Sequence, residues 1–185
     1  LGLDPDKPVA LFAGRFVDQK NPLAIPEVMA AAPYWSLLIA GLGPLGDQLE
    51  NVLASRGLLD RVRLLGWRDD VDRLMASADA FLSTANWEGY GGSVLEAHAS
   101  GTPIVAFAAP GVREVVQEGE SGLLIPLGDS QRLGASLERL AADESLAQRL
   151  RFGGPAIAAE CLPDASVASH LHYYDLLIEQ SRRGR

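Results

Sequence analysis

Lysine is scarce in this sequence, and the shortage limits the partners that the chain can have. Only Lys7 and Lys20 occur among 185 residues, and the formal net charge is −8 at pH 7. A protein of this charge has no broad basic surface with which to neutralise a nucleic-acid backbone. We therefore expect no nucleic acid as a partner. A small anionic ligand remains compatible with this charge, because phosphate binding needs only a few local hydrogen-bond donors.

Only one cysteine is present, and long apolar runs are missing. The single Cys161 has no partner for an internal disulfide, which is typical of cytoplasmic proteins. No stretch approaches the roughly 18 consecutive apolar residues of a membrane span. The chain starts at Leu1, with neither an initiating Met nor a signal peptide. We expect a cytoplasmic domain of a longer protein that meets a membrane, if at all, only through another domain.

Histidine is nearly absent, and no metal-binding pattern is visible. The three histidines, His98, His170 and His172, form no Cys/His cluster with the spacing of metal ligands. The sequence therefore predicts no metal site. We expect His98 to be an ordinary packed or surface residue.

What the sequence does contain is typical of one packed α/β domain. It is 48% apolar and 22% charged, and a chain of this length forms a single core. Short apolar runs alternate with helical patterns, which predicts a mainly parallel sheet. The six runs that we expect to be buried strands are residues 9–13, 37–40, 62–65, 80–83, 104–107 and 123–125.

The segments between these runs repeat apolar residues at the period of a helix. One apolar side holds Leu45, Leu49, Val52 and Leu53, and Gly57 is placed to end that helix. A later stripe of Leu133, Leu137 and Leu140 predicts a second helix, with Asp129 or Ser130 as its cap. Leu146 and Leu150 predict a third helix, and a fourth is predicted over residues 164–181. The pattern predicts a doubly wound, Rossmann-like six-stranded sheet with helices on both faces, and one domain over residues 1–185.

Ligands bind beyond the carboxyl ends of strands in such sheets, so the loops there are the candidate site. After the first strand, Gly14 lets a backbone come close, and Arg15 and Lys20 can reach phosphate oxygens. This is either a diphosphate clamp or an ordinary surface Arg and Lys in a turn. After the second strand, residues 41–44 are more typical of a tight turn than of a nucleotide fingerprint.

The loop after the third strand offers a weaker candidate. Backbone groups of Leu65 and Gly66 could read the edge of a nucleobase. Trp67 beside them is more typical of a packing residue than of a base contact.

The loop after the fourth strand is the richest. Residues 86–97 carry three glycines within four positions, Gly89, Gly91 and Gly92, and lead into a helix whose N-terminus suits a phosphate. Glu88 precedes the glycines and Glu96 follows them. Two carboxylates that border one crevice can accept hydrogen bonds from the hydroxyls of a sugar and a ribose.

Together these segments resemble the retaining glycosyltransferases of the GT-B fold, group 1 family. The residues that carry the resemblance are 14–20, 41–44, 62–66, 88–97, 99–105, 111–116 and 118–124. The resemblance implies the C-terminal half of a two-domain enzyme. This half would bind a nucleoside-diphosphate sugar, with UDP as the favoured carrier and GDP or ADP as alternatives, and an N-terminal domain outside this chain would bind the acceptor.

The resemblance also implies roles for single residues. Arg15 and Lys20 would face the diphosphate, Glu96 would hold the ribose and Glu88 the transferred sugar, so that Glu88, Arg15 and Lys20 would act in catalysis. The remaining binding residues would be Gly14, Leu65, Gly66, Tyr90, Gly91, Gly92, Ser93 and Val94. Such enzymes need no metal or other cofactor, and this half alone is expected to be inactive. Gly92 and the pair Asn86 and Trp87 depart from the usual family pattern, so the identity of the donor sugar cannot be inferred from the resemblance.

Two other interpretations stay open. The chain could be a noncatalytic module that binds a nucleotide-sugar. It could also belong to a sugar-nucleotide epimerase or a phosphorylase of related architecture. An epimerase needs further acid-base groups beside the sugar. A phosphorylase of this type needs a pyridoxal-phosphate lysine, and neither Lys7 nor Lys20 is placed for one.

Overall fold

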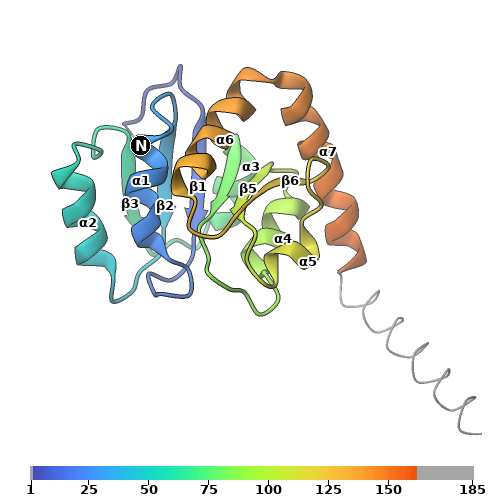
Figure 1. Ribbon diagram of the computed structural model, residues 1–185, viewed down its shortest axis with the longest axis horizontal. Helices are drawn as coiled ribbons and strands as arrows, with labels where there is room; N and C mark the ends of the chain where they lie inside the picture. The colour runs from blue at the N-terminus through green and yellow to red at the C-terminus, as the bar shows by residue number, and fades with distance from the viewer. Residues whose placement is uncertain (1, 162–185) are drawn as a thin grey trace, which may run out of the picture.

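The structure, a computed structural model, describes residues 2–161 and is built on one parallel sheet (Figure 1). The strand order is β3-β2-β1-β4-β5-β6, and every neighbouring pair is parallel. The predicted fold class is confirmed. Three of the expected strands have the expected bounds, and the other three are one residue longer. The strands are β1 (Val9–Ala13), β2 (Ser36–Ala40), β3 (Val62–Gly66), β4 (Ala80–Ser83), β5 (Ile104–Phe107) and β6 (Gly122–Ile125).

Helices cover both faces of this sheet because successive strand residues point to opposite sides. Phe12 packs with one set of helices and Leu11, its neighbour, with the other. On the face of Phe12 lie α1 (Ile25–Ala30), α2 (Gly46–Ser55) and α6 (Ser130–Ala142); on the opposite face lie α3 (Val71–Ser77), α4 (Gly92–Ala99) and α5 (Val112–Val115). A 3₁₀ turn, Pro22–Ala24, leads into α1.

The longest helix of the described residues, α7 (Glu144–Glu160), follows α6 and packs along α4 at the edge of the molecule (Figure 1). Leu146 and Leu150 are buried as their spacing predicts, and the Asp143 carboxylate caps the helix by accepting from the N–H of Leu146 at 2.9 Å. In the same way Asp129, one of the two expected caps, accepts from the N–H of Arg132 at 3.0 Å. The predicted helix over 164–181 lies outside the described residues.

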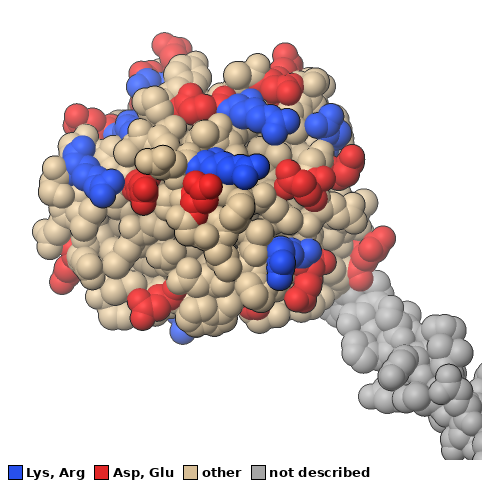
Figure 2. All heavy atoms as spheres, viewed as in Figure 1, with Lys and Arg blue, Asp and Glu red and all other residues tan. Residues whose placement is uncertain are grey.

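The short helices α1 and α3 do not appear among the sequence predictions. With six and seven residues, neither repeats an apolar position often enough to show a helical period. No helix among residues 2–161 has the length and apolar character that crossing a membrane requires. On the face drawn in Figure 2, Lys and Arg alternate with Asp and Glu, and no broad basic patch forms.

The strand order places the candidate site. The chain runs outward from β1 to β2 and β3 on one side, and from β4 to β5 and β6 on the other. Where the order reverses, the loops that leave β1 and β4 lie side by side at the carboxyl end of the sheet, the end at which doubly wound folds bind their ligands. Lys20 and Glu88 lie on these two loops.

Candidate functional site

An ion pair joins the loops that follow β1 and β4. The ammonium of Lys20, on the loop after β1, lies 2.5 Å from Oε1 of Glu88, on the loop after β4. Their side chains are 16% and 6% exposed. The lysine stem runs past Gly14, where a Cβ would lie 3.4 Å from two of its carbons. The fold therefore assembles three of the predicted site residues from two distant segments.

Hydrogen bonds to backbone groups fasten these two loops. The side chain of Asn86 donates to the carbonyl of Asp18 at 2.8 Å, and its N–H donates to the carbonyl of Gln19. The hydroxyl of Thr84 donates to the carbonyl of Lys20 at 2.9 Å. Asn86, which departs from the usual family pattern, thus has a structural role that the sequence analysis missed. Its signal was a polar amide three positions after the end of a buried strand.

Helix α4 begins at the glycine-rich loop without a side-chain cap. Its N-cap is Gly91, with φ +68°, a left-handed conformation that disfavours a Cβ. Gly92 and Ser93 follow at the helix start, where no side chain of residues 2–161 caps the free N–H groups. The open end can therefore bind an anion, supported by the helix dipole. A Cβ at Gly92 would meet nothing within 4 Å, so packing does not require glycine there.

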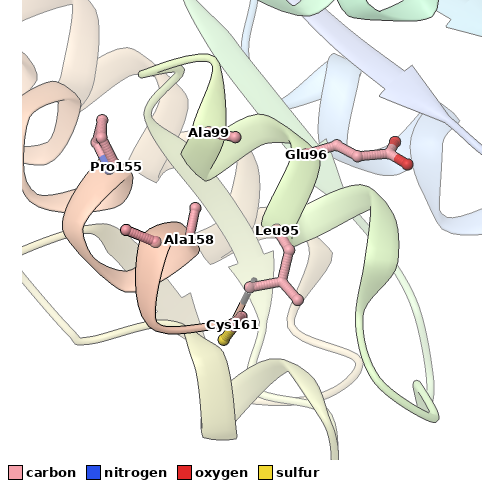
Figure 3. A pocket seen from close by; sticks show the side chains of 7 residues that line it. Leu95, Glu96, Ala99, Pro155, Ala158 and Cys161 are labelled. Atoms are coloured by element: carbon pink, nitrogen blue, oxygen red, sulfur yellow. The ribbon is translucent and has the colours of Figure 1, made fainter. Parts of the chain in front are cut away.

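The second carboxylate, Glu96, lies one turn further along α4 and is exposed. Figure 3 shows its carboxylate pointing away from α7. The hollow in that view, of about 370 Å³, lies between α4 and α7 and is lined by apolar side chains such as Leu95 and Pro155. The carboxylate of Glu96 is thus free to meet a ligand on the other side of α4.

A second hollow, of about 420 Å³, lies at the carboxyl ends of β1, β2 and β3. Arg15 lies at its wall together with Leu42, Trp67 and Arg68. The Arg68 guanidinium binds both oxygens of Asp70, at 2.7 Å each. Trp67 is 71% exposed, so the expectation that it is a packing residue is wrong. Neither Trp67 nor Arg68 was assigned to the site from the sequence.

The glycines after β2 bring the loops around this hollow together. A Cβ at Gly41 would lie 1.9 Å from the carbonyl oxygen of Gly14, and one at Gly43 would lie 2.5 Å from that of Phe16. The N–H of Phe16 donates to the carbonyl of Leu42 at 2.9 Å. These glycines permit close backbone packing. The turn itself lies at 43–46, two residues later than predicted, where the N–H of Gly46 donates to the carbonyl of Gly43 at 3.0 Å.

Of the twelve predicted binding residues, Gly14 and Arg15 line the second hollow and Glu96 lines the first, whereas the other nine line neither. The side chain of Val94 is fully buried, and its N–H donates to the carbonyl of Gly91 at 2.9 Å. Leu65 packs against the core under α3 and α4, and Gly66 offers its carbonyl to the N–H of Gly41 at 2.8 Å. Tyr90, in contrast, is 61% exposed on the glycine-rich loop. Within residues 2–161 no group of three or more His, Cys, Asp or Glu side chains could hold a metal ion.

His98, also on α4, is fully buried, which agrees with the expectation of a packed residue. Burial lowers its pKa below the ordinary value of 6.5, although the bond from the ring to the Val115 carbonyl acts in the opposite direction. The unfolded chain therefore binds a proton at His98 at a higher pH than the folded chain. This contribution to the free energy of unfolding is complete above about pH 6.5 and is lost as the pH falls.

We expect wild-type protein to lose more stability between about pH 7.5 and about pH 5.5 than His98→Gln, by at most about 1.4 kcal/mol per pH unit. Urea unfolding at both pH values measures this difference. Parallel losses in the two proteins would show that His98 does not contribute to the pH dependence.

The comparison with known proteins identifies the family. The sequence matches the family described as glycosyl transferases group 1 over residues 1–155. The chain belongs to this family. Its Rossmann-like sheet is that of one half of a GT-B glycosyltransferase.

Two individual proteins show which glycosyltransferases this domain is similar to. It is 34% identical over 149 residues to the lipopolysaccharide core biosynthesis glycosyltransferase LpsE of Rhizobium meliloti, covering 80% of this chain and 44% of LpsE. It superimposes on Anabaena HepE in complex with UDP with a TM-score of 0.82 and 26% identity, covering 91% and 48% of the two chains. The chain thus spans less than half the length of these relatives.

A third comparison concerns the fold alone. The crystal structure of the C-terminal domain of LpcC, a group 1 family protein of Francisella tularensis, matches with a TM-score of 0.75 and 21% identity. The match covers 85% of this chain and 86% of that domain. The fold therefore corresponds to a C-terminal domain whose structure has been solved by itself.

Proposed function

We propose that this chain is the sugar-donor half of a retaining group 1 glycosyltransferase and that it binds a UDP-sugar. The observation that carries the proposal is the pairing of Lys20 with Glu88 between the loops after β1 and β4, next to the start of α4, which has no side-chain cap. Cations and free N–H groups suit a diphosphate, and the carboxylate suits sugar hydroxyls. UDP is the favoured carrier because HepE, 26% identical to this chain, is solved in complex with it.

Each part of the donor has a place in this proposal. The nucleoside occupies the hollow beside Trp67 and Arg68, and Glu96 accepts from the ribose hydroxyls. Arg15, Lys20 and the N–H groups of Gly92 and Ser93 bind the diphosphate. The transferred sugar lies against Glu88.

The chemistry follows from where negative charge develops. When the bond between the sugar and UDP breaks, charge accumulates on the departing diphosphate. Arg15, Lys20 and the α4 N-terminus stabilise that charge from fixed positions without a metal ion. The acceptor attacks from the face that UDP leaves, which retains the configuration at the sugar. A domain outside these residues presents the acceptor.

The test of this function compares UDP with uridine. We expect Arg15→Ala to weaken UDP about ten- to a hundredfold, because one charged hydrogen bond to the diphosphate is lost. Uridine, which lacks the diphosphate, should bind both proteins alike. Titration calorimetry measures both affinities.

Arg56→Ala is the matched control, because Arg56 is exposed at the far end of α2. It should leave both affinities unchanged. If Arg15→Ala weakened uridine as much as UDP, Arg15 would not contact the diphosphate. If UDP, GDP and ADP all failed to bind the wild-type chain, the proposed function itself would fall.

A further inference from the structure

His98 has a bonding pattern that core packing alone does not require. It is fully buried on α4, and its Nε2 lies 2.9 Å from the carbonyl oxygen of Val115, the last residue of α5. Because a carbonyl only accepts, Nε2 carries the proton. Nδ1 is buried without a hydrogen-bond partner among residues 2–161. The ring therefore makes one directed bond, and that bond goes to α5.

Helix α7 leaves room for this ring. A Cβ at Gly154 would lie 2.7 Å from His98 Nδ1 and 3.1 Å from its Cα. Any other residue at position 154 would force the imidazole or α7 to shift. Gly154 thus allows α7 to pack closely on α4 while His98 keeps its present position.

At its other end, α5 contacts the proposed site. The helix begins after Gly111, where a Cβ would lie 2.3 Å from the carbonyl oxygen of Glu88. The N–H of Glu88 donates to the carbonyl of Pro110 at 2.9 Å. The backbone that carries the Glu88 carboxylate therefore rests directly on the loop that starts α5.

The side of α5 also forms the wall behind the glycine-rich loop. A Cβ at Gly91 would lie 3.5 Å from a methyl carbon of Val115. Helix α5 has only four residues, too few for internal hydrogen bonds to satisfy its terminal carbonyls. It depends on outside partners to keep its place, and His98 supplies one.

From these contacts we infer that His98 is a positioning residue for the sugar donor: it holds α5 behind the glycine-rich loop and thereby fixes Glu88 and the start of α4. This inference rests on the proposed function. It predicts that loss of the imidazole bond weakens ligands that contact the glycine-rich loop and spares ligands that do not.

The test compares three variants with UDP and uridine as probes. His98→Leu removes the donor and should weaken UDP about three- to tenfold, the effect expected for one lost buried hydrogen bond, with uridine unchanged. His98→Gln keeps an N–H donor close to the Nε2 position and should restore most of the affinity for UDP. Thr102→Val is the matched control. Thr102 is also buried and donates to a carbonyl, that of Met75 on α3, at 2.7 Å, so this variant should lose stability but keep its affinity for UDP.

A second measurement uses the wild-type protein and does not depend on any variant folding. Coupling between two sites is reciprocal, so saturating UDP should slow amide hydrogen exchange in residues 112–116, although these do not line the proposed site. Exchange in 112–116 that UDP leaves unchanged would overturn the inference. So would UDP affinity in His98→Leu equal to that of the wild type. Absence of UDP binding in the wild type would instead overturn the proposed function.

Discussion

Supplied with a UDP-sugar and a panel of acceptors, the chain should bind the sugar donor but form no glycoside at an enzymatic rate. All the site groups described above are proposed to bind the donor, and the chain covers only 44% of LpsE and 48% of HepE. Holding the acceptor oxygen against the anomeric carbon contributes roughly 7–11 kcal/mol to such reactions. Without that contribution the rate should fall by about five to eight orders of magnitude.

The exposure of the donor site to water should also keep its affinity for the donor modest. Arg15 is exposed, and its field on a diphosphate in water is weaker than in a closed, dry cleft. We expect dissociation constants of roughly micromolar to millimolar size.

A radiolabelled sugar on the donor allows product to be counted, with a two-domain group 1 glycosyltransferase in the same assay as the positive control. Calorimetry on the same preparation verifies that the donor is bound. Turnover by this chain within about a hundredfold of the two-domain enzyme would show that the acceptor site lies within these residues.

The second large effect concerns stability. Lys20→Met should lower the free energy of unfolding by about 3 kcal/mol, because it leaves the Glu88 carboxylate buried and unpaired. We expect the low end of the usual range, since the Lys20 side chain keeps 16% exposure. Methionine preserves most of the apolar stem beside Gly14, so lost packing contributes little. Thermal unfolding should shift down by roughly 6–12 °C.

Two further variants test whether the buried, unpaired carboxylate causes this loss of stability. Lys20→Met combined with Glu88→Gln should recover most of the loss, because no unpaired charge is then buried. Lys7→Met changes the other lysine of the sequence, which is partly exposed before β1, and should be nearly neutral. A double variant no more stable than Lys20→Met would mean that the ion pair is not the source of the effect.

The sheet was predictable because each strand is a short, mostly apolar run; five of the six are largely buried, and the edge strand β3 is half-buried. β1 and β4 were predicted with the bounds that the structure has, since buried strands show a local signal that needs no knowledge of neighbours. Short α1 and α3 were missed because one or two turns do not establish a helical period.

The site was predictable only in part. Glycines and carboxylates in one loop indicated Glu88 and Glu96, and strand ends indicated Arg15 and Lys20. Trp67 was expected to pack in the interior, but it is exposed beside a hollow. Its exposure depends on the loops of β1 and β2 beside it, which sequence periodicity does not describe.

By itself, the sequence determined the fold class, the strands and the loops that carry the candidate chemistry, because these depend on local patterns of apolar residues and glycine. The tertiary structure alone decided which of these groups meet. The bond between Lys20 and Glu88 joins residues that lie 68 positions apart in the sequence. The contacts that lead from His98 to Glu88 run from α4 through α5 to the loop after β4. Such contacts depend on strand order and on close approach of backbone segments. The residues adjacent in the sequence therefore give no indication of them.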